Sequence, residues 1–195
     1  MNLPNKLTIT RIALAPVFMI LFLIDNRYTR LLALAVFFVA ALTDLIDGYL
    51  ARRNGWVTGF GKFMDPLADK ILTSTAFICL VSLNYVKAWM VLAIVGREFL
   101  ITGIRSLAAY KGWVIMPTIL AQWKTASQMV VILGILTFYE SRMLLEPLGL
   151  HWPIFDSPWP ARVIDASVFV VMLLTVITGL DYLIKNAALI KGVLR

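Results

Sequence analysis

The chain has 195 residues, of which 61% are hydrophobic and only 15% are charged. A soluble globular domain carries more charge than this, and the apolar residues here form blocks about as long as a membrane crossing. The formal net charge of +7 does not indicate nucleic-acid binding, because basic stretches studded with aromatic residues are missing. We attribute the excess to cytoplasmic loops and to contact with anionic lipid headgroups. The single cysteine excludes a disulfide framework and a cysteine-based zinc cluster.

Six apolar stretches follow one another along the sequence and predict six transmembrane helices. We expect these helices at residues 7–24, 31–53, 67–83, 88–109, 125–139 and 161–184. The connections are expected at residues 25–30, 54–61, 84–87, 111–124 and 140–160. No internal repeat or linker divides the sequence, so residues 1–195 are expected to form a single domain.

Six crossings place both termini on the same side of the membrane. Under that layout most of the 18 lysines and arginines fall on the side of the termini. Because cytoplasmic loops carry the excess of basic residues, we expect both termini in the cytoplasm. The predicted fold is therefore an all-α integral membrane protein with six transmembrane helices.

Two local signals mark helix ends. Asp65 followed by Pro66 is typical of a helix start, with Asp65 as the N-cap and Pro66 at the first helical position. Near the end of the sixth helix, Asp181 and Lys185 are four residues apart and are expected to pair on one helical face.

Four aspartates lie on either side of the second connection. Asp44 and Asp47 are three residues apart and Asp65 and Asp69 are four apart, so each pair shares one helical face. Carboxylates beside apolar runs are costly unless a cation offsets their charge. One interpretation pairs them with nearby basic residues, namely Arg52, Arg53, Lys62 and Lys70. Four oxygen donors without histidine or cysteine instead favour bound Mg²⁺ or Mn²⁺.

Small residues and an arginine accompany the first aspartate pair. Gly48 and Ala51 leave the same helix bare, so a flat or bulky group has access to its backbone, although small residues also serve helix packing. Arg52 offers a bidentate fork that suits phosphate. A metal pair neutralises a pyrophosphate during in-line displacement, and a carboxylate less engaged with metal takes the proton of an attacking hydroxyl. These features indicate phosphoryl transfer on a lipid at the cytoplasmic surface.

The pattern D-x-x-D-G-x-x-A-R-(x)8-G-x-x-x-D-x-x-x-D resembles the signature of the CDP-alcohol phosphatidyltransferases. Its fixed positions are all matched, at Asp44, Asp47, Gly48, Ala51, Arg52, Gly61, Asp65 and Asp69. Similarity extends to the opening Asn2–Thr8 segment, to Arg97-Glu98-Phe99, and to Lys124-Thr125. The chain is most similar to the bacterial members of the family that make phosphatidylglycerophosphate.

The resemblance implies a homodimer in the bacterial cytoplasmic membrane, with a polar cavity between the helices that opens to the cytoplasm. It also implies that the 1-hydroxyl of sn-glycerol 3-phosphate attacks the β-phosphorus of CDP-diacylglycerol and releases CMP. Two divalent cations, Mg²⁺ or Mn²⁺, are implied at Asp44, Asp47, Asp65 and Asp69, with Asp69 also acting as the general base. The nucleotide and its pyrophosphate are implied to meet Gly48, Ala51 and Arg52, with Thr58, Gly61 and Lys62 as helpers.

The acceptor phosphate requires cations at the same level of the membrane. Arg105 and Lys124 flank the cytoplasmic connection at residues 111–124, and Arg97 lies deeper in the fourth helix. Arg97 has a second interpretation, as half of an internal ion pair. Glu98 is its neighbour in sequence and is therefore expected to face elsewhere. Many relatives have Lys-x-Lys-Thr where this chain has Gln122-Trp-Lys124-Thr125, so one cation of the acceptor motif is missing.

Two alternatives remain open. The first is a phosphatidyltransferase of the same family that uses inositol phosphate, serine or phosphatidylglycerol as the acceptor. The second is a small cation channel or transporter whose acidic cluster is an ion site, although the paired halves of many transporters are not visible here.

Overall fold

A computed structural model describes the backbone of residues 3–54, 59–111, 119–145, 149 and 152–187. Side chains are described over the same ranges except residues 3–5, 44–54, 59–63, 65–66 and 119–122. Over these ranges the chain is helical and contains no strand. Its elements are α1 (Leu3–Leu23), α2 (Arg27–Asn54), α3 (Gly59–Ser82), α4 (Ala88–Tyr110), α5 (Ile119–Leu145), the short 3-10 helix η2 (Pro153–Phe155) and α6 (Trp159–Lys185).

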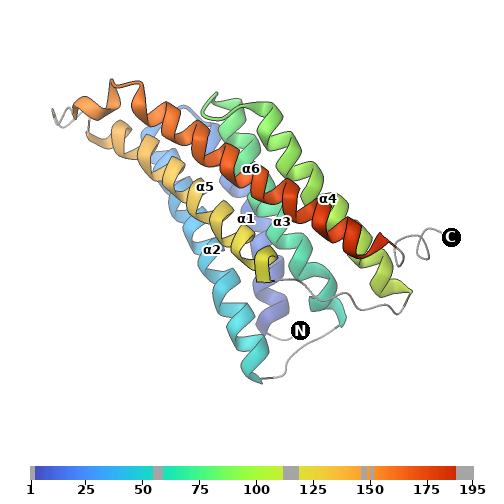
Figure 1. Cartoon of the computed structure of the whole chain (residues 1–195). Helices are drawn as coiled ribbons and strands as arrows, with labels where there is room; N and C mark the ends of the chain where they lie inside the picture. Colours follow the sequence, from blue (N-terminus) through green and yellow to red (C-terminus); the bar gives the residue numbers. More distant parts are fainter. Residues whose placement is uncertain (1–2, 55–58, 112–118, 146–148, 150–151, 188–195) are drawn as a thin grey trace.

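The α-helices run alternately up and down through one bundle (Figure 1). The starts of α1, α3 and α5 and the ends of α2, α4 and α6 lie toward one end, which we call the carboxylate end. The turn between α3 and α4 lies at the other end, which we call the turn end. Helix α1 packs mainly against α2 and α3, while α6 packs mainly against α4 and α5. The expected all-helical architecture is confirmed for the described residues.

Aromatic side chains fill the core between α1 and α2. The ring of Phe18 lies 5.4 Å from that of Phe22 and 5.3 Å from that of Phe37, and all three side chains are fully buried. Ring pairs at this separation stabilise beyond the area they bury. The contact between Phe18 and Phe37 therefore stabilises the packing of α1 against α2.

The outer surface of the bundle is strongly apolar. Leu92 in α4 is 74% exposed, Val130 in α5 is 69% exposed and Ile177 in α6 is 59% exposed. Such exposure on several helices fits a lipid surrounding, in which apolar side chains face hydrocarbon and helices satisfy their own backbone hydrogen bonds. Among the described residues, three segments are long and apolar enough to cross a membrane by length and composition, at Lys6–Leu23, Trp123–Leu145 and Trp159–Lys185.

The turn between α3 and α4 is tightly closed. The Asn84 amide donates to the carbonyl of Val81 and the Tyr85 amide donates to the carbonyl of Leu80, each at 2.9 Å. Asn84 has a φ of 59°. This pair of bonds around a left-handed residue is the Schellman ending of a helix, and asparagine tolerates the left-handed conformation better than most residues. The turn expected at residues 84–87 is confirmed.

Two expected helix starts are wrong. Helix α3 begins at Gly59, so Asp65 and Pro66 lie inside it and Asp65 is not its N-cap. Helix α5 begins at Ile119, so Lys124 is a helical residue and not the end of a loop. Proline removes a single backbone bond, and membrane-type helices tolerate that loss, as Pro16 inside α1 also shows. The polar connection expected at 140–160 is likewise shortened, because α5 continues to Leu145.

Candidate active site

The motif residues occupy the carboxylate end of α2 and α3. Helix α2 carries five of them near its end, at Asp44, Asp47, Gly48, Ala51 and Arg52, and helix α3 carries three near its start, at Gly61, Asp65 and Asp69, together with the expected helper Lys62. Thr58 lies outside the described residues, as do the side chains of all the others except Asp69. The backbone therefore places both aspartate pairs where α2 ends and α3 begins.

Asp69 presents its two carboxylate oxygens to different surroundings. Oδ2 accepts a bond from the Lys70 ammonium at 2.9 Å, whereas Oδ1 is buried and has no hydrogen-bond partner among the described residues. A buried polar atom without a partner is costly and calls for a ligand. An oxygen donor of this kind suits Mg²⁺ or Mn²⁺, so the one described member of the aspartate set fits a metal.

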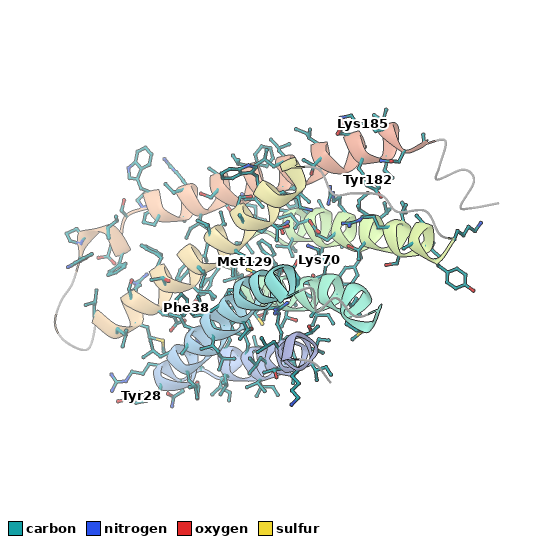
Figure 2. The ribbon with its side chains drawn as sticks, turned by 90° about the horizontal axis from the view of Figure 1, so that it is seen from below. Tyr28, Phe38, Lys70, Met129, Tyr182 and Lys185 are labelled. Carbon is teal, nitrogen blue, oxygen red and sulfur yellow. The ribbon has the colours of Figure 1, made fainter. Side chains whose placement is uncertain are left out.

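Lys70 bridges Asp69 and a carboxylate on another helix. Its Nζ lies 3.0 Å from Oε2 of Glu98 in α4, and both residues are almost completely buried, at 8% and 4% exposed. Figure 2 shows Lys70 pointing into the interior of the bundle, in contrast to Lys185 on the outer side of α6. Glu98 was expected to face elsewhere than Arg97, but its carboxylate lies in the same group of buried charged residues as Arg97.

Glu98 has two further partners in α5. Its Oε1 accepts a bond from Lys124 in α5 and a second, at 3.2 Å, from the Gln128 side-chain amide. Gln128 also donates to Thr175 of α6 at 3.2 Å. Buried charges persist in a protein interior when they are paired and hydrogen-bonded in this way. We call Asp69, Lys70, Arg97, Glu98, Lys124, Gln128 and Thr175 the Glu98 cluster.

Arg97 of α4 is the last member of the Glu98 cluster, and its side chain extends toward α6. Its Nη2 donates to Thr178 at 3.1 Å, and its Nη1 lies 3.6 Å from Oε1 of Glu98. The side chain crosses close above Gly179, where a Cβ atom would lie 2.6 Å from Nε. The internal ion pair that the sequence left open is therefore present.

Arg105 lies seven residues after Glu98 in α4 and so on the same helical side, two turns nearer the carboxylate end. It interacts electrostatically with Tyr182 of α6, a buried residue whose hydroxyl has no hydrogen-bond partner among the described residues. Tyr182 lies between α6 and α4 in Figure 2. The pair expected at Asp181 and Lys185 is confirmed, at 2.9 Å.

The structure thus joins Asp69, Arg97 and Lys124 in one buried network. Sequence reasoning missed three members of this network: Glu98, Gln128 and Thr175. Lys70 was expected as a possible partner of the aspartates, and its pair with Asp69 is present at 2.9 Å. Glu98 carried a usable signal, because an acidic residue inside an apolar helix is a functional candidate in its own right. Three cations, Lys70, Arg97 and Lys124, face two carboxylates, Asp69 and Glu98, so the network retains one positive charge and suits a further anion.

Comparison with known proteins defines the class. Residues 1–178 match the family CDP-alcohol phosphatidyltransferase. The match covers more than half of the chain, and this protein belongs to that family. The chain is thus an enzyme of the phosphatidyltransferase class with membrane-type helices.

Several relatives share one name, CDP-diacylglycerol–glycerol-3-phosphate 3-phosphatidyltransferase. The protein from Bacillus subtilis strain 168 is 39% identical, with 97% of each chain covered. The protein from Rickettsia bellii is 36% identical over 93% of each chain, and that from Cereibacter sphaeroides is 31% identical over 97% of each chain. This chain is therefore similar over nearly its full length to transferases named for glycerol 3-phosphate.

Proposed function

We propose that this protein transfers the phosphatidyl group of CDP-diacylglycerol to sn-glycerol 3-phosphate, giving phosphatidylglycerophosphate and CMP. The names of the full-length relatives support the substrates. The observation that carries the proposal is the Glu98 cluster, which has one more cation than carboxylates. It also contains Asp69, whose Oδ1 has no hydrogen-bond partner among the described residues. A phosphorylated alcohol requires this combination, with cations for its phosphate and a base for its hydroxyl.

In the proposed reaction the 1-hydroxyl oxygen of glycerol 3-phosphate forms a bond to the β-phosphorus of CDP-diacylglycerol. The bond from that phosphorus to the oxygen bridging it to the α-phosphorus breaks, and CMP leaves with the electron pair. Asp69 is proposed to accept the hydroxyl proton on Oδ1, because Oδ2 bonds Lys70. A carboxylate oxygen has two lone pairs, so Oδ1 is proposed to use one for the proton and the other for a cation. Holding the reacting groups in line contributes much of the rate acceleration in phosphoryl transfer.

The acceptor phosphate is proposed to bind Lys124, Arg105 and Arg97. Lys124 and Arg97 already converge on Glu98, and Arg105 follows on the same side of α4. The nucleotide is proposed to bind at the end of α2 and the start of α3, through Gly48, Ala51, Arg52, Thr58, Gly61 and Lys62.

Two divalent cations, Mg²⁺ or Mn²⁺, are proposed at Asp44, Asp47, Asp65 and Asp69. When bound, they neutralise the pyrophosphate and stabilise the charge that develops on the oxygens in the transition state. The bare Oδ1 of Asp69 is the described atom that supports this assignment.

The proposed setting is the bacterial cytoplasmic membrane, with six crossings and both termini in the cytoplasm. Exposed apolar residues on α2 and α4, such as Phe38 and Leu92, support crossings beyond the three found by length and composition. The cavity is proposed to open to the cytoplasm at the carboxylate end, and the protein to act as a homodimer, as the family resemblance implies.

An acceptor panel tests the proposed function. Purified protein in detergent receives CDP-diacylglycerol with glycerol 3-phosphate, inositol phosphate, serine or phosphatidylglycerol, each with Mg²⁺ and with Mn²⁺, and CMP release is measured. We expect glycerol 3-phosphate to give the highest kcat/KM and a chelator to abolish release. Equal rates with inositol phosphate would contradict the choice of acceptor, and no CMP release with any acceptor would contradict the proposed reaction.

A further inference from the structure

Glu98 connects the proposed base to the proposed acceptor site. One of its carboxylate oxygens bonds Lys70, which also bonds Asp69, and the other bonds Lys124. The path from Asp69 to Lys124 thus runs through two ammonium groups and one carboxylate, in residues from α3, α4 and α5. Glu98 is the one described anion that contacts both lysines.

The position of Lys70 decides which oxygen of Asp69 is available. Its ammonium bridges Oδ2 of Asp69 at 2.9 Å and Oε2 of Glu98 at 3.0 Å, and Oδ1 of Asp69 has no hydrogen-bond partner in the described part of the chain. An ammonium held from two sides has a fixed place, whereas a lysine on its flexible stem has many. Glu98 therefore fixes Lys70, and Lys70 fixes the orientation of the Asp69 carboxylate.

Burial makes this arrangement sensitive to the charge of Glu98. Lys70, Glu98 and Lys124 are 8%, 4% and 4% exposed. Without the carboxylate, two buried ammonium groups lose their shared counter-ion, and uncompensated buried charges rearrange at a large energetic cost. Lys70 then retains Asp69 as its one described anionic partner.

We propose that Glu98 is a positioning residue that acts through Lys70, orienting Asp69 toward the acceptor hydroxyl while it holds Lys124 at the acceptor phosphate. This inference rests on the proposed role of Asp69 as the base. It assigns to Glu98 no contact with the reacting atoms. It predicts that removing the charge of Glu98 lowers kcat far more than it weakens binding of CDP-diacylglycerol.

The central variant is Glu98→Gln, which keeps the shape of the side chain and removes its charge. We expect kcat to fall about 10- to 100-fold, because small misplacements of a reacting group have effects of this size. KM for CDP-diacylglycerol should change less than about twofold, since uniform binding is not affected. The Glu98→Asp variant keeps the charge on a shorter stem and should recover part of the lost kcat.

Glu140→Gln is the matched control. Glu140 is also a glutamate in an apolar helix and is 2% exposed. It follows Tyr139, whose ring stacks at 3.6 Å on that of Tyr85 in the α3–α4 turn, so it belongs to the turn end. The same chemical change there should leave kcat within about twofold of the unmodified protein, since distant sites act independently.

A double variant separates positioning from general destabilisation. If Glu98 acts through Lys70, then Glu98→Gln combined with Lys70→Met should have the same kcat as Lys70→Met alone, because coupled groups are non-additive. Additive losses, or a kcat of Glu98→Gln within about twofold of the unmodified protein, overturn the proposal. Should Glu98→Gln fail to fold, as judged by thermal unfolding in detergent, Glu98→Asp combined with Lys70→Met decides by the same comparison.

All variants are assayed with whichever acceptor the unmodified protein uses best in the panel. A wrong choice of glycerol 3-phosphate is therefore detected in the unmodified protein, before any variant is compared. Failure of the Glu98 proposal is detected afterwards, as a variant kcat that does not fall or does not couple to Lys70.

Discussion

The two ends of the bundle bury the same kind of residue in different ways. At the carboxylate end, Glu98 contacts Lys70, Lys124 and Gln128 and draws Arg97 to within 3.6 Å. At the turn end, Glu140 has Arg30 as its electrostatic partner, and its Oε2 has no hydrogen-bond partner among the described residues. One glutamate is at the centre of a network, and the other has one cation, Arg30, as an electrostatic partner among the described residues.

Two other contacts at the turn end are an aromatic stack and a surface ion pair. Tyr85 and Tyr139 stack with their rings nearly parallel, 4° apart. The ion pair of Lys87 with Asp165 is at the surface, where such pairs contribute little. The comparison teaches that an ion pair alone does not identify the active end. The charged side chains there are buried and contact partners on several helices.

The sharpest test of this difference removes one carboxylate from each end. Asp69→Asn should lower kcat about 1,000-fold, because a general base contributes roughly 10²- to 10⁴-fold, while binding of the CDP nucleotide is largely retained. Asp165→Asn removes the partly exposed carboxylate of the turn end and should leave kcat nearly unchanged. CMP release and nucleotide binding by calorimetry measure both effects. Near-normal CMP release by Asp69→Asn would rule out Asp69 as the base.

A second pair of variants compares one lysine at each end. Lys124→Met should raise KM for the acceptor about 10- to 100-fold, since hydrogen bonds to charged groups contribute roughly 1.5–3 kcal/mol. KM for CDP-diacylglycerol should not change. Lys87→Met, which removes a lysine whose side chain is 57% exposed, should change neither KM. Initial rates over both substrate concentrations decide, and equal effects of the two variants would remove Lys124 from the acceptor site.

Much of the fold could be predicted from the sequence, because apolar blocks and polar turns are local signals. The turn at Asn84 and the pair of Asp181 with Lys185 depend on residues close in sequence, and both are confirmed. The predicted start of α3 was wrong, because Asp65-Pro66 is also compatible with a helix interior when packing and lipid stabilise the helix.

The Glu98 cluster was harder to predict because its contacts join helices distant in the sequence. Lys70 and Glu98 come from different helices, and nothing in their spacing fixes how α3 and α4 are placed. The rule that neighbouring helical residues face different ways also gave a wrong expectation for Glu98. The rule applies to Cβ directions and not to the ends of long side chains. Arg97 does turn toward α6 and Glu98 toward α3, yet their long side chains still meet at 3.6 Å.

The smallest expected effect addresses the two interpretations of Arg97. A Cβ atom at Gly179 would lie 2.6 Å from Nε and 2.9 Å from Cγ of Arg97, so Gly179→Ala forces this side chain to move. If Arg97 binds the acceptor phosphate, KM for the acceptor should rise about fivefold, corresponding to roughly 1 kcal/mol. Gly96→Ala is the control, because a Cβ there meets nothing within 4 Å. It should keep KM unchanged and raise the melting temperature slightly, since alanine favours a helix over glycine by about 1 kcal/mol. An unchanged KM in Gly179→Ala, with a lower melting temperature, would assign Arg97 to the internal ion pair alone and confine the acceptor cations to Lys124 and Arg105.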